Sequence, residues 1–264
     1  MYEFAYHHPK SLADAVKLLG GDKEAKALAG GQTLIPTLKQ RLAQPSGLID
    51  LGGVAELKGI KLAGKTLTIG AMTTHAEVAA SADVAKSIPA LAALAGNIGD
   101  AQVRNRGTLG GSIANADPAA DYPAAVVGLG ATVKTNKREI KADDFFKGLF
   151  ATALADGEIV VSVSFPVPDK AGYAKFPQPA SRFALVGVFV CVTGKSVRVA
   201  VTGAGPAVFR LPGMEEALAK SFAPASLDPI TIDTKHLNDD MHASRAYRAH
   251  LVTVMAKRAV AAAG

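Results

Sequence analysis

The stretch from residue 105 to residue 123 restricts the fold more than any other part of the sequence. It reads Asn-Arg-Gly-Thr-Leu-Gly-Gly-Ser-Ile-Ala-Asn-Ala-Asp-Pro-Ala-Ala-Asp-Tyr-Pro, with few large apolar side chains from which to build a core. Its glycines allow close approach of the backbone, and its N–H and O–H groups can donate hydrogen bonds. Residues 29–36, Ala-Gly-Gly-Gln-Thr-Leu-Ile-Pro, have the same chemistry. We interpret the two stretches as halves of one anion-binding site.

The composition is that of a globular chain with a sizeable core. Of 264 residues, 49% are hydrophobic, which suits two or three subdomains. The net charge is +6, but the basic residues are scattered and tryptophan is absent, so we expect no nucleic-acid partner. No apolar run reaches the ~18–20 residues of a membrane span, and the first residues do not resemble a signal peptide. We therefore expect no transmembrane segment.

The single cysteine, Cys191, lies in an apolar run. A lone cysteine forms no internal disulfide and cannot hold an iron–sulfur cluster. We expect a buried, unreactive thiol.

Periodicity and capping signals divide the chain into three regions, residues 1–53, 54–170 and 171–264. In the first region we predict a helix opened by a capping box of Ser11 and Asp14. We then predict a strand at residues 25–29, a helix at 34–42 and a strand at 48–51. In the second we predict a hairpin at 57–70 and a helix opened by a capping box of Thr74 and Glu77. We also predict helices at 89–96 and 119–129, a second hairpin at 131–142 and a strand at 158–165. In the third we predict strands at 184–192 and 196–202, followed by helices at 213–220 and 242–263.

The first glycine pair, Gly30-Gly31, falls between a predicted strand and a predicted helix N-terminus. Such a turn can aim backbone N–H groups and the helix dipole at an anion, and a diphosphate is the natural ligand. A tight turn without a ligand is the alternative. Thr108, Gly110, Gly111 and Ser112 repeat the pattern in what we take to be a second loop. Neither stretch fits the P-loop or Gly-x-Gly-x-x-Gly.

Two carboxylates follow the second glycine pair. Asp117 and Asp121 could serve as acid and base or as metal ligands, and Asp121 could accept a hydrogen bond from a ribose hydroxyl. For Asp117 we favour a helix N-cap before Pro118. His75 is expected at the surface or in the core rather than in catalysis, and no histidine has convincing metal-ligand spacing. The chemistry is therefore expected to belong to a bound cofactor.

Four segments carry a resemblance to a known family. Residues 29–36 and 105–121 resemble the two FAD-diphosphate loops of the flavoprotein subunits of molybdenum hydroxylases. Residues 69–75 resemble the opening of the family's second flavin subdomain, and residues 174–187 the start of its C-terminal domain. The resemblance covers essentially the whole chain. It is closest to the medium subunit of aerobic carbon monoxide dehydrogenase, whereas the xanthine dehydrogenase flavin domain is more distant.

The resemblance implies an α+β fold. It has a two-subdomain FAD-binding unit of the PCMH type, which is vanillyl-alcohol-oxidase-like, in residues 1–53 and 54–170, followed by a C-terminal α+β domain with an antiparallel sheet. It also implies a set of FAD contacts: Ala29, Gly30, Gly31, Gln32, Thr33, Leu34, Ile98, Thr108, Gly110, Gly111, Ser112, Asp121, Val160 and Lys175. Lys175 would lie near the flavin ring, where a cation could stabilise reduced flavin.

The resemblance further implies an electron-transfer role within an oxidoreductase complex. A large subunit would carry the molybdenum cofactor, a small subunit two 2Fe–2S clusters, and this chain FAD, as a cytoplasmic dimer of heterotrimers that can associate with the inner face of the membrane. The substrate (carbon monoxide, a purine, an aldehyde or an N-heteroaromatic) and the final acceptor stay open. Alternatives are a stand-alone flavoprotein oxidoreductase and a flavin-free docking subunit.

Overall fold

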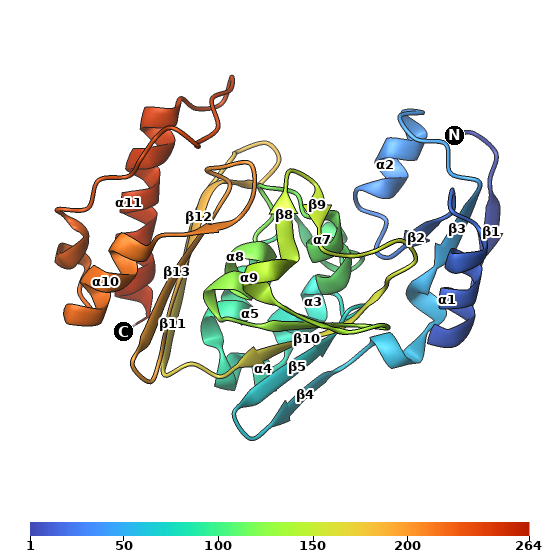
Figure 1. Ribbon diagram of the computed structural model, residues 1–264, viewed down its shortest axis with the longest axis horizontal. Coiled ribbons are helices and arrows are strands. Elements are labelled where there is room, and N and C mark those ends of the chain that lie inside the picture. The colour runs from blue at the N-terminus through green and yellow to red at the C-terminus, as the bar shows by residue number, and fades with distance from the viewer. Residues whose placement is uncertain (264) are drawn as a thin grey trace.

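The computed structural model describes residues 1–263 and contains three main sheets that follow one another along the chain. The small N-terminal sheet and the C-terminal sheet lie at opposite ends of the molecule, with a five-stranded sheet between them (Figure 1). Helices and strands are both abundant, as the predicted α+β class requires. Each sheet lies in one of the three predicted regions, although β11 already begins at Lys170.

The N-terminal sheet is parallel, in the order β1-β3-β2, and helices follow its first two strands. Its elements are β1 (Ala5–His7), α1 (Leu12–Gly21), β2 (Lys26–Leu28), α2 (Leu34–Lys39) and β3 (Gly47–Asp50). The Ser11 hydroxyl caps α1 by accepting the N–H of Asp14 at 3.1 Å. However, the Asp14 carboxylate accepts the Ser11 hydroxyl instead of a backbone N–H, so the predicted capping box is only half formed.

The central sheet is antiparallel, in the order β4-β5-β10-β6-β7. Its strands are β4 (Ile60–Ala63), β5 (Thr66–Gly70), β6 (Thr132–Thr135), β7 (Glu139–Lys141) and β10 (Val160–Pro166). The helices of this region are α3 (His75–Ala80), α4 (Ala82–Ser87), α5 (Pro89–Gly96), α6 (Ala101–Arg104), α7 (Leu109–Asn115), α8 (Tyr122–Gly128) and α9 (Ala142–Phe145). A short hairpin joins β8 (Phe146–Gly148) and β9 (Ala151–Thr152). Single 3-10 turns occupy Leu51–Gly53 and Ala55–Leu57.

Local sequence signals place the central helices with mixed success. The Thr74–Glu77 capping box is complete, because each side chain bonds the other residue's backbone N–H. The helix expected from residue 119 starts only at Tyr122. The Asp117 carboxylate accepts the N–H of Ala119 at 2.9 Å in a turn before that helix, so our N-cap interpretation of Asp117 was wrong.

The C-terminal sheet is covered on both faces of its central strand β12, and that strand is therefore almost wholly apolar. It has the order β11-β12-β13-β14, all antiparallel. Along β12, Val188 and Val190 pack into the core beneath α11, whereas Phe189 and Cys191 pack into the core shared with α8. Cys191 is buried, as predicted. The elements are β11 (Lys170–Pro177), β12 (Ala184–Thr193), β13 (Ser196–Thr202), β14 (Phe209–Arg210), α10 (Pro212–Lys220), a 3-10 turn (Pro224–Leu227) and α11 (Arg245–Ala262).

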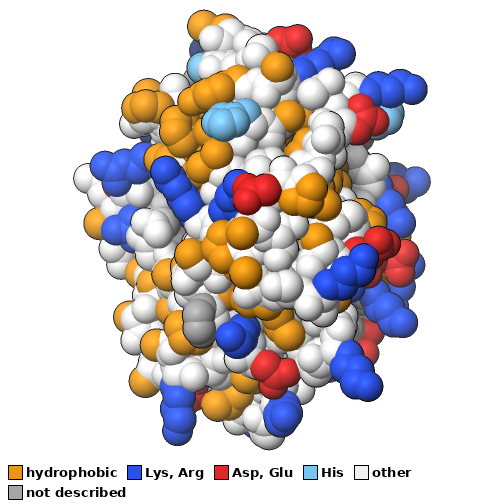
Figure 2. Space-filling model, turned by 90° about the vertical axis from the view of Figure 1, so that its left-hand side faces the viewer, with side chains coloured by type: hydrophobic (Ala, Val, Ile, Leu, Met, Phe, Trp, Pro, Cys, Tyr) orange, Lys and Arg blue, Asp and Glu red, His pale blue; other side chains and the backbone are white. Residues whose placement is uncertain are grey.

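The outer surface on the side of α10 and α11 carries basic, acidic and apolar side chains that are intermixed over the described residues (Figure 2). Among residues 1–263, no helix is both long and apolar enough to cross a membrane.

Candidate functional site

A cavity of about 620 Å³ is lined mainly by residues of the N-terminal and central regions, together with residues 181–183 of the C-terminal region. Its wall combines the two glycine-containing stretches, residues 29–34 and 107–112. Every predicted FAD contact except Lys175 lines this cavity: Ala29, Gly30, Gly31, Gln32, Thr33, Leu34, Ile98, Thr108, Gly110, Gly111, Ser112, Asp121 and Val160. The structure therefore brings together residues that are up to about 130 positions apart in the sequence. Their role in FAD binding remains a prediction.

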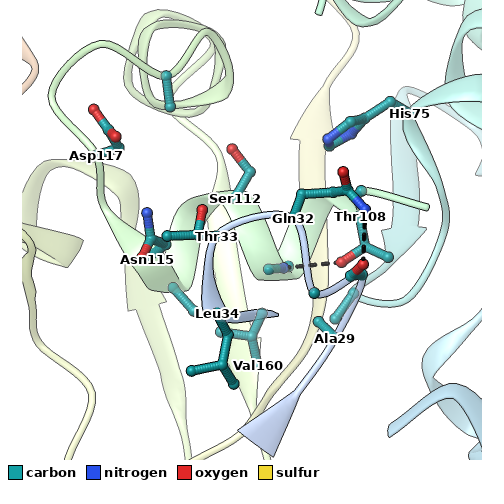
Figure 3. A pocket seen from close by; sticks show the side chains of 18 of the residues that line it. Ala29, Gln32, Thr33, Leu34, His75, Thr108, Ser112, Asn115, Asp117 and Val160 are labelled. Carbon is teal, nitrogen blue, oxygen red and sulfur yellow. Dashed lines mark hydrogen bonds between the residues drawn. The ribbon is translucent and has the colours of Figure 1, made fainter. Parts of the chain in front are cut away.

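The first glycine stretch lines the cavity and has free backbone donors. Within the described residues, the N–H groups of Gly31, Gln32, Thr33 and Leu34 bond no protein acceptor, although Ile35 already donates to the Gly31 carbonyl at 3.0 Å. Gly31 has φ +71°, a conformation that suits glycine. The Gln32 side-chain amide folds back and donates to the Gly30 carbonyl at 3.2 Å (Figure 3). Four successive unpaired N–H groups form an anion-binding arrangement.

The second glycine stretch differs from our expectation, because it is the first turn of helix α7 rather than a loop. The backbone donors of its residues 109–112 are already used, whereas the N–H of Thr108 has no partner among the described residues. Leu109 donates to Thr73 O at 3.1 Å and Gly110 to Ala71 O at 2.8 Å, while Gly111 donates to the Thr108 hydroxyl at 3.1 Å. The donors that α7 offers to the cavity are thus side chains such as Ser112 (Figure 3).

The glycines allow protein segments to pack against each other. A Cβ on Gly30 would lie 2.1 Å from the Arg106 carbonyl oxygen, and a Cβ on Gly110 would lie 2.5 Å from Cβ of Ala71. A Cβ on Gly111 would lie 3.1 Å from Cβ of Ala29. At Gly30 and Gly111 the close neighbour belongs to the other glycine stretch or directly precedes it, so the two halves of the site pack tightly together.

Asp121 is a buried carboxylate at the cavity wall, with 4% of its surface exposed. Its Oδ1 accepts the Tyr173 hydroxyl at 2.5 Å and lies 2.9 Å from Lys175 Nζ. Burial raises the pKa of Asp121, and the Lys175 ammonium and the Tyr173 hydroxyl act in the opposite direction. We therefore treat Asp121 as an ionised carboxylate paired with the Lys175 ammonium, because both side chains are buried and in contact.

Lys175 does not line the cavity. Besides Asp121, its ammonium donates to the carbonyl oxygens of Asn97 at 2.9 Å and Arg182 at 3.1 Å. These contacts tie β11 to the end of α5 and to the segment before β12. The predicted contact of Lys175 with the flavin ring remains untested, and its observed role is to hold Asp121.

Several cavity residues were not predicted from the sequence. Asn115 follows Ser112 by nearly one helical turn on α7 and could have been found from that spacing. Phe150 and Phe183 line the cavity although both are substantially exposed, and no local pattern marks them. Phe150 has φ 52°, which is unusual for an aromatic residue.

Glu158 also lines the cavity, but its carboxylate is committed to the protein. It forms hydrogen bonds with Thr135 at 2.7 Å, with Arg138 at 3.1 and 3.0 Å, and with the N–H of Ala155 at 2.8 Å. The Arg138 guanidinium is the main reason why the pKa of Glu158 is lowered to about 2. The hydrogen bonds of Glu158 stabilise the start of β10 at the cavity wall. Among residues 1–263, no cluster of three His, Cys, Asp or Glu side chains has the geometry to hold a metal ion.

Comparison with known proteins adds independent information. Residues 2–168 match the family model described as the FAD binding domain in molybdopterin dehydrogenase. The chain is 37% identical to the nicotine 6-hydroxylase medium subunit of Paenarthrobacter nicotinovorans, over 98% of this chain and 96% of that protein. It is 35% identical to the carbon monoxide dehydrogenase medium chain of Hydrogenophaga pseudoflava, with the same coverage. The crystal structure of quinoline 2-oxidoreductase from Pseudomonas putida 86 is similar with a TM-score of 0.89, 32% identity, and coverage of 99% of this chain and 97% of that chain.

Proposed function

The chain belongs to the family of FAD-binding domains of molybdopterin dehydrogenases, and from this we propose that it is the FAD-binding, electron-transferring medium subunit of a heteromeric molybdenum hydroxylase. It is an oxidoreductase subunit of the family that the sequence motifs predicted. Beyond FAD binding, we also propose a path for the electrons and the partner subunits that supply them.

One observation carries the proposal: four successive residues with unpaired backbone N–H groups, Gly31 to Leu34, line a cavity of about 620 Å³. These four residues are exposed or only partly buried, so their N–H groups are open to a bound acceptor and to water. A diphosphate supplies several anionic oxygens for such a row of donors, and the size of the cavity suits a cofactor. The residues present therefore fit FAD.

The residues of the chain would bind and orient the cofactor. The amides of the first glycine stretch would hold the diphosphate, with hydroxyl donors from Thr33, Thr108 and Ser112 around it. Asp121 would accept a hydrogen bond from a cofactor hydroxyl, and Tyr173 and Lys175 hold its carboxylate in place. Ile98 and Val160 add apolar surface to the wall. Bound FAD would accept electrons and pass them on, which the side chains of the protein cannot do themselves.

We infer the remaining subunits from the relatives. Proteins named as medium chains or medium subunits belong to assemblies with larger and smaller chains. We propose that electrons arrive from 2Fe–2S clusters of a small subunit, after substrate oxidation at the molybdenum cofactor of a large subunit, and leave to an external acceptor. We further propose a cytoplasmic dimer of heterotrimers. Substrate choice would then lie in the large subunit.

The test begins with the purified chain and its absorption spectrum before and after addition of FAD. Flavin bands that bleach with dithionite are expected, and a chain that takes up no FAD would contradict the proposal. The chain co-expressed with its partner subunits should then be mixed with substrate under anaerobic conditions. Flavin bleaching that requires the iron–sulfur subunit supports the relay. Bleaching of the isolated chain by a small-molecule substrate would instead identify a stand-alone flavoenzyme.

A further inference from the structure

We propose that His75 is a further binding residue of the cavity, and that its Nε2–H donates a hydrogen bond to the diphosphate of FAD. This inference rests on the proposed binding of FAD. The sequence predicted only a surface or core position for this residue.

The backbone around His75 is fixed against the second glycine stretch. His75 is the first residue of α3, directly after the Thr74 cap, and its N–H donates to the Gly107 carbonyl at 3.0 Å. Thr74 pairs with Thr108 in an isolated bridge. The imidazole is therefore attached to a segment that cannot move independently of the cavity wall.

The imidazole ring has two close neighbours. A Cβ on Gly107 would lie 2.6 Å from Nε2 and 2.8 Å from Cδ2 of His75. The Tyr122 ring lies 5.3 Å away, centroid to centroid, at an angle of 46°. The ring lines the cavity and appears among its side chains on the side of Gln32 and Thr108 (Figure 3). Such packing orients the ring without using its hydrogen-bonding groups.

Neither ring nitrogen has a protein partner within residues 1–263. Nδ1 is completely buried and unpaired. Nε2 is not among the fully buried atoms and lies beside Gly107, which lines the cavity as His75 does. Burial and, secondarily, the charge of Arg104 lower the pKa of His75 to about 4. The imidazole is thus neutral near pH 7, with one N–H and one lone pair.

The surroundings select the tautomer. A buried N–H without an acceptor is costlier than a buried lone pair, so the proton belongs on Nε2 rather than on the enclosed Nδ1. Nε2–H then needs an acceptor in the cavity. Because the ring packs on Gly107, and Gly107 packs on Gly30, this donor lies next to the stretch whose amides are also unpaired. One anionic group can satisfy both.

Three variants separate hydrogen bonding from packing. In His75→Gln the side-chain amide nitrogen reaches the position of Nε2, whereas in His75→Asn it reaches only that of Nδ1. His75→Phe keeps the ring and removes both nitrogens. Tyr122→Phe is the matched control, because it removes a buried hydroxyl that has no partner and leaves the ring. Dissociation constants are measured for FAD and for ADP by fluorescence and by ultrafiltration.

We expect His75→Phe and His75→Asn to raise the dissociation constant of FAD about tenfold or more, and His75→Gln to stay within about threefold of the wild type. ADP should lose affinity in parallel, because it shares the diphosphate. Equal affinity of the Gln and Asn variants would overturn the proposal even if the Phe variant failed to fold. A loss for FAD without a loss for ADP would overturn the choice of the diphosphate as acceptor. Failure of the wild type to bind FAD would instead contradict the proposed function itself.

Discussion

Lys175 Nζ lies 2.9 Å from the carboxylate of Asp121, and both side chains are buried. The pair joins β11 of the C-terminal sheet to the residue that precedes α8 in the central region. Asp121 lines the cavity and Lys175 does not, so the C-terminal region, which also places Phe183 at the cavity wall, contributes to the site by holding a residue of its neighbour. This gives a structural reason why the third region accompanies the FAD-binding unit.

Separating this pair should destabilise the fold as well as the site. Asp121→Asn leaves the Lys175 ammonium buried without its counter-charge, and we expect a loss of about 3 kcal/mol in the free energy of unfolding. Lys175→Met should cost a similar amount, and the double variant less than the sum of the two. Urea unfolding of the FAD-free chain measures all four proteins. Strictly additive losses would show that the two side chains do not interact.

Gly30 should not tolerate even a methyl group. In Gly30→Ala the new Cβ meets backbone atoms of Arg106 and Gly107, which cannot rotate away, so we expect a loss of about 1–3 kcal/mol in stability and weaker FAD binding. Gly213→Ala is the matched control, because a Cβ there has no neighbour within 4 Å. Within α10 that control should be neutral or stabilise the protein by up to about 1 kcal/mol. Chemical unfolding and FAD titration of both variants check this. Equal behaviour of the two would refute the packing role of Gly30.

The stability of the protein should fall between pH 6.5 and pH 4 because of His75. Its pKa is lowered from 6.5 to about 4, so in this window the unfolded chain binds a proton that the folded chain does not. At pH 5 the difference corresponds to about 2 kcal/mol relative to pH 7, and above pH 6.5 the effect vanishes. His75→Phe and His75→Gln should both lose this component when unfolding is measured at pH 7 and pH 5. An unchanged pH dependence in both variants would show that His75 titrates normally in the folded protein.

Glu158 should contribute a second, more acidic decline in stability. Its folded pKa of about 2 lies below the ordinary 4.5, so its stabilisation is complete above pH 4.5 and is lost as the pH falls towards 2. Glu158→Gln keeps the shape but removes the charge-assisted bonds, and we expect a loss of about 1–3 kcal/mol at pH 7. The variant should also show a shallower decline between pH 4.5 and pH 2 in thermal unfolding. A decline as steep as that of the wild type would assign the acid sensitivity to other carboxylates.

Features set by neighbouring residues could be predicted from the sequence. The Thr74–Glu77 box, the glycine pair between β2 and α2, and the apolar strand β12 all follow from spacing and side-chain type. The family resemblance, and not a local pattern, predicted that most of the residues named as FAD contacts would lie together at one site. By contrast, Phe150 and Phe183 line the cavity without any pattern to mark them.

The sequence by itself determined the composition of the site: two stretches of small and hydroxyl-bearing residues, and a chain whose chemistry must come from a cofactor. Only the tertiary structure decided which donors are free. The amides of α7 are used by Ala71, Thr73 and Thr108, whereas those of residues 31–34 are not, and Lys175 bonds Asp121 instead of facing the cavity. The physical reason is that a hydrogen-bonding group is available to a ligand only if no neighbouring segment satisfies it, and those neighbours are distant in the sequence.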